Sequence, residues 1–168
     1  MSRVILITGG QRSGKSEEAE RLALSLSDCP VYMATAHVWD EEFHERVERH
    51  QQRRGPQWTT IEEERRLSSH DLTGRVVLVD CITLWLTNLL FDTKDAEHAL
   101  TAAKAEFDRL VAQDATFIFV TNEIGCGGVS VDKLQRQFTD LQGWMNQYVA
   151  QRADEVLLMV SGIAVKIK

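Results

Sequence analysis

Residues 9–16 read Gly9-Gly10-Gln11-Arg12-Ser13-Gly14-Lys15-Ser16, and this stretch decides the fold. It fits the pattern G-x-x-x-x-G-K-[ST] of a phosphate-binding loop, with an aliphatic run before it and a helical pattern after it. The glycines let backbone N–H groups approach phosphate oxygens, and the helix N-terminus adds positive potential. In such a loop Lys15 reaches the β and γ phosphates of a nucleotide and Ser16 binds Mg²⁺. The alternative is a glycine-rich turn that only packs a strand against a helix.

Strands and helices alternate on either side of this loop. Apolar runs predict strands at 3–8, 30–34, 57–61, 76–80, 116–121, 156–160 and 164–167. Helical spacing predicts helices at 15–26, 41–54, 84–91, 95–112 and 132–151, the last with Asp132 as its N-cap. This alternation predicts an α/β fold of the P-loop NTPase type (RecA-like), a mostly parallel sheet with helices on both faces. We see no linker or repeat, so residues 1–168 are expected to form one nucleotide-binding domain.

Composition narrows the function classes. The 168 residues are 43% hydrophobic and 26% charged, which is typical of a soluble globular protein. The net charge of −6 disfavours nucleic acid as a partner, so an anionic ligand needs a local site. The apolar runs are too short for a membrane span, and the first ten residues do not resemble a signal peptide. Three widely separated cysteines indicate neither a disulfide framework nor a zinc site, which suggests a cytoplasmic protein.

Asp80 ends one of the buried apolar runs and is a candidate second ligand for Mg²⁺. It could also be the N-cap of the helix that follows, and the two roles are compatible. A signalling GTPase would carry a guanine-reading N-K-x-D motif, whereas the strand at 116–121 leads into Thr121-Asn122-Glu123-Ile124. The sequence therefore favours a small-molecule kinase or a nucleotidyl transferase.

The predicted helix at 41–54 has an unusual polar side. At about 100° per residue, His50 and Arg54 fall on the side that Phe43 and Val47 mark as buried, with arginines flanking it at positions 46 and 53. Arginines facing a polar cavity suit phosphate. His50 could therefore be a general base, an electrostatic partner or a nucleophile on phosphorus, or else an ordinary histidine at the boundary of the core.

The other histidines are less informative. His37 follows the strand at 30–34, at the edge of an α/β sheet where ligands bind, so it is expected to line the site. His44, His70 and His98 are expected on the surface. Trp39, Trp58, Trp85 and Trp144 could contact a large planar substrate, although core or subunit packing is the more usual role.

An ordered set of motifs covers nearly the whole chain. It comprises residues 8–16; Ala34-Thr35-Ala36; Asp40-Glu41-Glu42-Phe43 leading into Arg46-Val47-Glu48-Arg49-His50; Trp58-Thr59-Thr60-Ile61-Glu62; Asp80-Cys81-Ile82-Thr83-Leu84-Trp85; Asn88-Leu89-Leu90; Thr121-Asn122-Glu123-Ile124-Gly125; Asn146-Gln147; Ala153-Asp154-Glu155-Val156; Ser161-Gly162; and Val165-Lys166. This set resembles the bifunctional adenosylcobinamide kinase and adenosylcobinamide-phosphate guanylyltransferase family of cobalamin biosynthesis. The phosphate loop alone is common to many families, whereas the whole set is specific.

The resemblance implies two reactions. A nucleoside triphosphate, ATP or GTP, phosphorylates the aminopropanol hydroxyl of adenosylcobinamide. GTP then guanylylates a histidine that matches His50, and GMP moves to adenosylcobinamide phosphate to give adenosylcobinamide-GDP. Lys15 and His50 are the implied catalytic residues, Ser16 and Asp80 the implied Mg²⁺ ligands, and a homotrimer with sites between subunits the implied assembly.

The resemblance also implies the residues of the guanine nucleotide site. They are Gly9, Gly10, Gln11, Arg12, Ser13, Gly14, Lys15, Ser16, Thr35, Ala36, His37, Gln51, Gln52, Arg53, Arg54, Glu62 and Asp80. Glu62 is suited to accept hydrogen bonds from guanine N–H groups, or it is simply one of the solvated acids at 62–64. Two other functions stay open: a kinase of another small alcohol with a structural His50, and a slowly hydrolysing regulatory module.

Overall fold

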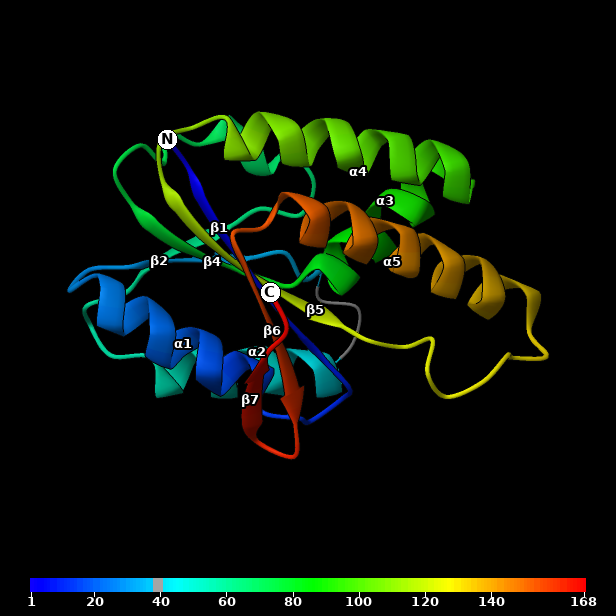
Figure 1. Ribbon diagram of the computed structural model, residues 1–168, viewed down its shortest axis with the longest axis horizontal. Helices are drawn as coiled ribbons and strands as arrows, with labels where there is room; N and C mark the ends of the chain where they lie inside the picture. The colour runs from blue at the N-terminus through cyan, green and yellow to red at the C-terminus, as the bar shows by residue number, and fades with distance from the viewer. Residues whose placement is uncertain (38–40) are drawn as a thin grey trace.

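The glycine-rich loop joins strand β1 (Arg3–Gly9) to helix α1 (Lys15–Leu26) in the computed structural model of the chain (Figure 1). The structure describes residues 1–37 and 41–168, apart from the side chains of Glu42, Phe43, Arg46, His50 and Arg53. Gly14 precedes α1 with a φ of 94°, a left-handed conformation that favours glycine. The strand, loop and helix predicted around residues 9–16 are confirmed.

The remaining elements follow the predicted alternation. The strands are β2 (Val31–Ala34), β3 (Thr59–Glu62), β4 (Val76–Asp80), β5 (Thr116–Asn122), β6 (Glu155–Val160) and β7 (Ile163–Lys166). The helices are α2 (Glu41–Arg53), α3 (Ile82–Thr93), α4 (Ala96–Val111) and α5 (Lys133–Arg152), with a short 3-10 helix η1 at Leu67–Ser69 that the sequence pattern did not predict. Asp132 caps α5 as expected, because its carboxylate accepts a hydrogen bond from the Gln135 N–H.

All of these strands form one sheet in the order β3-β2-β4-β5-β1-β6-β7. The pairs from β3 to β6 are parallel, and β7 returns antiparallel to β6 through a tight turn. The mostly parallel sheet predicted from the apolar runs is confirmed. A parallel sheet buries both faces, which explains why strands such as β1 and β4 are almost continuously apolar.

Helices cover both faces of the sheet (Figure 1). Alternate residues of β1 point to opposite sides, so Val4 and Leu6 pack in one core and Ile5 and Ile7 in the other. The first core contains buried residues of α3, α4 and α5, and the second contains Ala19 and Ala23 of α1. None of the helices in the described ranges is long and apolar enough to cross a membrane.

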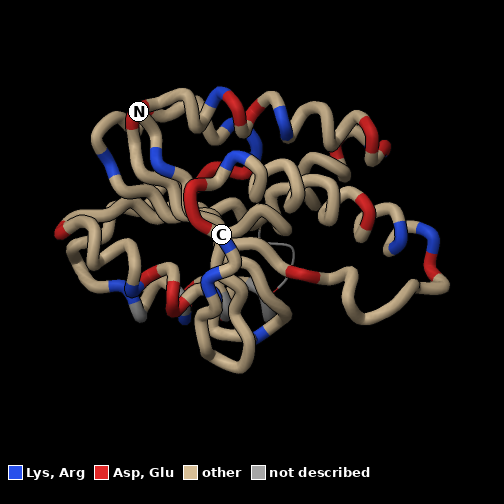
Figure 2. Tube along the Cα trace, viewed as in Figure 1, with Lys and Arg blue, Asp and Glu red and all other residues tan. Residues whose placement is uncertain are grey.

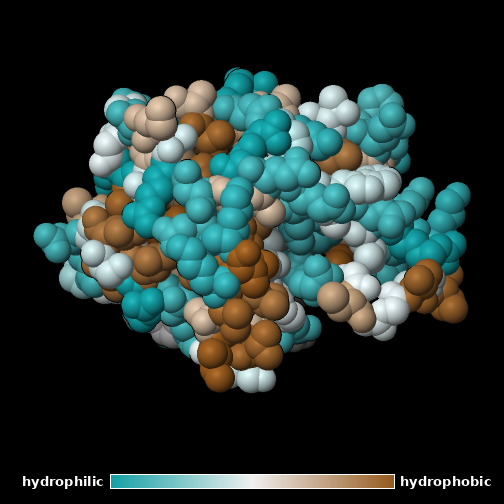
Figure 3. All heavy atoms as spheres, in the orientation of Figure 1, coloured by the Kyte–Doolittle hydropathy of each residue, from teal (hydrophilic) through white to brown (hydrophobic). Residues whose placement is uncertain are grey.

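Charged residues are spread over the whole molecule (Figure 2), whereas several exposed hydrophobic side chains gather in one place (Figure 3). Segments of Lys and Arg and segments of Asp and Glu are both scattered over the whole fold (Figure 2). Hydrophobic side chains gather over the β6–β7 hairpin (Figure 3), where Val160, Ile163, Val165 and Ile167 are each at least 44% exposed. Because β7 is the last strand of the sheet, its outer edge has no strand partner in the described part of the chain.

Candidate active site

The glycine-rich loop packs against the β6–β7 hairpin. Gly9 has a φ of 155°, and a Cβ there would lie 2.7 Å from the Met159 carbonyl oxygen. A Cβ on Gly14 would lie 3.2 Å from Gly162 Cα, and the Gly162 N–H donates to the Ser13 carbonyl oxygen over 2.9 Å. Glycine is therefore required at positions 9 and 14, since a side chain at either would displace the loop.

Lys15 is folded over the loop that precedes it. Its Nζ donates to the Gly10 carbonyl oxygen over 2.5 Å, and the residue is only 8% exposed. Burial lowers the pKa of Lys15, while the nearby Cys81 and Asp80 act in the opposite direction. An anion on the loop would further favour the charged ammonium, which is what a phosphate-binding lysine requires.

Asp80 lies at the end of β4 and does not cap α3, whose N-cap is Cys81 without a side-chain hydrogen bond. Instead, Asp80 Oδ2 accepts a 2.6 Å hydrogen bond from the Tyr32 hydroxyl. Burial and the Asp80 carboxylate raise the pKa of Tyr32 well above its usual value, so the hydroxyl remains a donor. The guanidinium of Arg54 lies 3.4 Å from the centre of the Tyr32 ring.

Thr35 supports the same strand end from behind. Its hydroxyl donates to the Cys81 carbonyl oxygen over 2.8 Å and accepts from the Cys81 N–H over 2.9 Å. Its own carbonyl accepts from Asn88 Nδ2 over 2.8 Å. Both side chains are buried, so Thr35 lies behind the surface that a nucleotide would contact.

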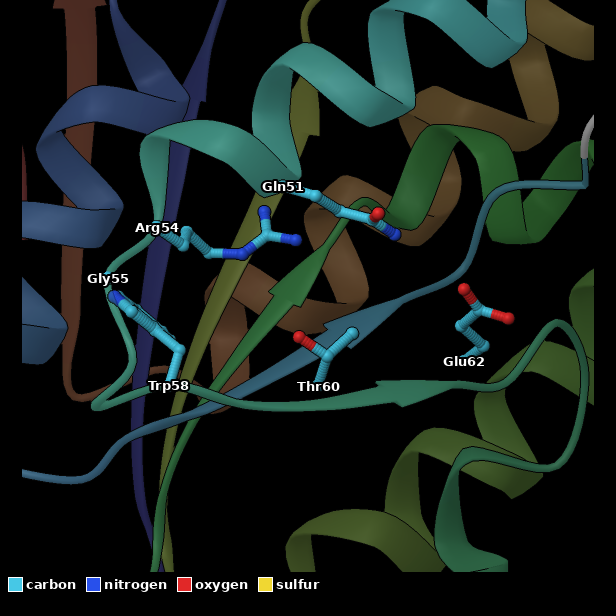
Figure 4. Close-up of a pocket in the computed structure, with 6 residues that line it drawn as sticks. All are labelled: Gln51, Arg54, Gly55, Trp58, Thr60 and Glu62. Atoms are coloured by element: carbon cyan, nitrogen blue, oxygen red, sulfur yellow. The ribbon is translucent and has the colours of Figure 1, made fainter.

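A pocket of about 540 Å³ opens between α2 and β3. It is lined by Gln51, Arg54, Gly55, Trp58, Thr60 and Glu62. Figure 4 shows Gln51 and Arg54 reaching from the end of α2 towards the strand that carries Thr60 and Glu62. Arg54 Nη1 is buried and has no hydrogen-bond partner among the described residues. The pocket thus offers a carboxylate, an amide, a hydroxyl and a guanidinium.

The sheet register connects this pocket to the phosphate loop. Ala34 pairs with Glu62 on β3 and with Asp80 on β4, so these three residues form one row across the sheet. Glu62 and Asp80 are two strands apart, about 10 Å, and point to the same face. This is the face of Ile7 and Gly9, because residues of β1 alternate and Ile7 packs in the core beneath α1.

His37 lies just beyond β2, as expected for a residue lining the edge of the site. Its Nδ1 is 2.9 Å from Glu64 Oε1, so the ring is oriented by a carboxylate. Ala36 is half-buried beside it. The expectation of exposed histidines holds for His44 and His98, whereas His70 is half-buried, with its Nε2 3.5 Å from Glu63 Oε2.

Two predicted site residues are described by their backbone alone. His50 and Arg53 belong to α2, but both side chains lie outside the described residues, as does Trp39. Gln51 and Gln52, which directly follow His50, are exposed. Gln11 and Arg12 are exposed at the tip of the phosphate loop, and Ser16 is half-buried in the first turn of α1.

Sequence reasoning missed Tyr32 and Thr60, and it favoured packing for Trp58. Tyr32 looked like a core residue of β2, and only the pairing of β2 with β4 brings it to Asp80. Alternation along β3 was the available signal for Thr60, since Trp58, Thr60 and Glu62 share one face while Ile61 packs on the other. Among the other tryptophans, Trp85 is buried and Trp144 is exposed.

The donor set fits Mg²⁺ better than a softer metal. The described residues include no cluster of three or more His, Cys, Asp or Glu side chains that could enclose an ion. Burial raises the pKa of Cys81 to about 12, so this neighbour of Asp80 remains a thiol. Mg²⁺ is usually held by one or two protein oxygens together with phosphates and water, and Ser16 and Asp80 supply such oxygens.

A G-x-x-x-x-G-K-S loop between a parallel strand and a helix, with a carboxylate ending a strand two places away, defines a nucleotide-binding protein of the P-loop class. Solved structures share this fold. The flagellar accessory protein FlaH from Methanocaldococcus jannaschii aligns with a TM-score of 0.50 and 14% identity, over 99% of this chain and 78% of its own. The P4 protein of bacteriophage phi6 aligns with a TM-score of 0.50 and 17% identity, over 97% of this chain and 54% of its own.

Closer relatives specify the family. Residues 5–167 match the family described as cobinamide kinase / cobinamide phosphate guanyltransferase. The bifunctional adenosylcobalamin biosynthesis protein CobU of Escherichia coli is 41% identical, covering 98% of this chain and 99% of its own length. The corresponding CobP protein of Pseudomonas aeruginosa is 40% identical, covering 97% and 96%. The chain belongs to this family of bifunctional transferases, which confirms the resemblance identified from the motifs.

Proposed function

We propose that one domain, residues 1–168, carries out both reactions of the family on adenosylcobinamide. A nucleoside triphosphate, ATP or GTP, first phosphorylates the hydroxyl of the aminopropanol arm. GMP from GTP is then transferred to the resulting phosphate through a covalent adduct on His50, giving adenosylcobinamide-GDP. The observation that carries this proposal is the row Glu62–Ala34–Asp80, because it sets a polar pocket and a phosphate loop on one face of the sheet.

In the kinase reaction, the substrate oxygen attacks the γ-phosphorus and the bond to the β-phosphate oxygen breaks. The hydroxyl proton leaves, and the nucleoside diphosphate departs. Backbone N–H groups of the loop hold the β and γ phosphates, and Lys15 offsets the charge that develops on them.

In the guanylyl transfer, a ring nitrogen of His50 attacks the α-phosphorus of GTP and pyrophosphate leaves. An oxygen of the cobinamide phosphate then attacks the same phosphorus, and the P–N bond breaks. Arg54 supports this assignment, because it lines a pocket whose wall includes the residue directly after His50, and its buried Nη1 has no hydrogen-bond partner among the described residues. A guanidinium there is suited to a phosphate oxygen.

Ser16 and Asp80 would hold Mg²⁺, which when bound neutralises phosphate charge. Glu62 would read the guanine base by accepting from its N1–H and its amino group. The pocket places this carboxylate opposite Gln51, so the base would lie between α2 and β3 (Figure 4).

We also propose a cytoplasmic homotrimer, as the resemblance implies. The three cysteines are free thiols, which suits a reducing compartment. The open edge of β7, with exposed Ile163, Val165 and Ile167, is the surface that a second copy would cover. Light scattering should give three times the 19.1 kDa chain mass, and Val165→Lys should lower it.

Covalent labelling tests the central step. The protein is incubated with Mg²⁺ and GTP labelled at the α-phosphate, denatured, and examined for label on the chain. His50→Ala and Lys15→Ala are compared with His44→Ala, a matched control, since His44 is exposed on the same helix and lies 3.3 Å from Glu48.

Wild type and His44→Ala should acquire label that is stable in base and labile in acid, as a phosphoramidate is. His50→Ala should acquire none while still binding GTP. Unlabelled wild-type protein with intact GTP binding would refute the His50 adduct and favour a kinase of another alcohol or a nucleotide-binding regulatory module.

A further inference from the structure

Tyr32 is a buried residue at the centre of the site that neither reaction accounts for. Its side chain is 5% exposed and contacts three other side chains. Its hydroxyl donates to Asp80 Oδ2 over 2.6 Å, and its ring face carries the Arg54 guanidinium at 3.4 Å. Its ring and that of Trp58 make a T-shaped contact, with ring centres 6.1 Å apart and an interplanar angle of 81°.

These partners belong to two parts of the site, which the row Glu62–Ala34–Asp80 joins through the backbone and Tyr32 joins through its side chain. Asp80 ends β4 near the phosphate loop, whereas Arg54 and Trp58 line the pocket between α2 and β3. Tyr32 pairs with Leu78, so its side chain points to the same face as Asp80 and reaches it diagonally. A phenylalanine would fill the same space in the core, so packing alone does not require the hydroxyl.

We propose that Tyr32 is a positioning residue that orients the Asp80 carboxylate towards the nucleotide's metal ion and, through its ring, holds the end of α2 over the same nucleotide. The proposal rests on the function proposed above, in which Asp80 is a metal ligand and Arg54 a nucleotide contact. The Tyr32 hydrogen bond occupies Oδ2, while Oδ1 accepts no side-chain hydrogen bond from the described residues and stays available to an ion. A hydrogen bond that orients a ligating carboxylate typically contributes 10- to 100-fold to metal affinity.

The ring contact has a separate consequence. The guanidinium carbon of Arg54 is stacked on the ring, and Nη1 has no hydrogen-bond partner among the described residues, so the stacked group keeps a donor for an anion in the pocket that Arg54 lines. Removal of the ring should let Arg54 adopt other rotamers, and nucleotide binding should weaken even without metal. The hydroxyl and the ring can therefore be tested separately.

The chain contains a matched control with the same chemistry. The Tyr148 hydroxyl donates to Asp108 Oδ2 over 2.7 Å, and the Arg152 guanidinium lies 3.4 Å from the centre of the Tyr148 ring. This group joins α4 and α5, whose buried residues pack in the core on the opposite face of the sheet. Tyr148→Phe thus removes a tyrosine–aspartate hydrogen bond of similar length that is exposed and far from the pocket.

The experiment measures binding of α,β-methylene GTP, which cannot transfer its guanylyl group. Affinity is determined by calorimetry in EDTA and across a Mg²⁺ titration, for wild type and for Tyr32→Phe, Tyr32→Leu, Tyr148→Phe and Asp80→Asn. Tyr32→Phe should need about tenfold more Mg²⁺ for half-maximal tightening, with unchanged affinity in EDTA. Tyr32→Leu should show the same Mg²⁺ shift and bind several-fold more weakly in EDTA, and Tyr148→Phe should match wild type.

A wild-type Mg²⁺ requirement in Tyr32→Phe, together with a raised requirement in Asp80→Asn, would overturn the inference and leave the proposed function intact. A wild-type requirement in both variants would refute the metal role of Asp80 itself. Thermal unfolding checks that each variant is folded, and Tyr32→Phe decides the hydroxyl's role even if Tyr32→Leu does not fold.

Discussion

Replacing Thr35 by valine removes one hydroxyl from the interior without changing the shape of the side chain. That hydroxyl makes two hydrogen bonds to the backbone of Cys81, at 2.8 Å and 2.9 Å, and Thr35 is 0% exposed. Valine would leave the Cys81 N–H without a partner, whereas the Cys81 carbonyl oxygen would keep the hydrogen bond that it accepts from the Trp85 N–H over 3.2 Å. The unpaired N–H costs about 1–3 kcal/mol and the lost bond to the carbonyl oxygen about 1 kcal/mol, so we expect Thr35→Val to lower the free energy of unfolding by about 2–4 kcal/mol.

Thr35→Ser is the matched control, because it keeps the hydroxyl and loses only a methyl group. Its expected cost is about 1 kcal/mol. Urea unfolding of both variants, analysed with a common m-value, gives the two losses directly. A loss below about 0.5 kcal/mol for Thr35→Val, or equal losses in the two variants, would refute the assignment of the hydroxyl as the support of this strand end.

Three further predictions concern single residues. Glu62→Gln should weaken GTP binding about tenfold in competition experiments and leave ATP binding unchanged, because an amide presents a mixed donor and acceptor to guanine; equal losses for both nucleotides would contradict it. Burial raises the pKa of Glu106, but hydrogen bonds, first that from the Ser68 N–H, lower it below the usual 4.5. The carboxylate therefore stabilises the fold above pH 4.5. Glu106→Gln should lower the free energy of unfolding at pH 7, and the difference between wild type and variant should become smaller as the pH falls below 4.5. Gly9→Ala should reduce pyrophosphate binding at least tenfold by calorimetry, because its Cβ would lie 2.7 Å from the Met159 carbonyl oxygen; wild-type affinity would show that the loop adapts.

Most strands and helices were predictable, because each of them has a local pattern of apolar residues in the sequence. Buried parallel strands are apolar on both faces, so β1 and β4 stand out in the sequence. Helix boundaries were less clear, and α3 begins two residues before its predicted start because Ile82 is fully buried. Strand order depends on pairings between residues far apart in the sequence, and no local pattern encodes it.

The site likewise contains residues that local sequence patterns predict and residues that only the folded structure brings together. The phosphate loop follows from a motif, and Asp80 follows from its place at the end of an apolar run. Tyr32 was not predictable, since it is 48 positions from Asp80 and nothing in its neighbourhood distinguishes it from a core tyrosine. Thr35 was expected beside the nucleotide, but whether a side chain faces the ligand or the strand behind it depends on packing.

The contacts behind the phosphate loop join two segments that lie far apart in the sequence. Residues 9–14 are held by residues 159–162, so the loop leaves the ribosome long before its support is made. Domains acquire their structure as the chain emerges from its N-terminus. A nascent chain that stops short of β6 therefore contains every residue of the nucleotide motif without the contacts that hold the loop, and bound nucleotide can stabilise this loop only after residues 159–162 have been made.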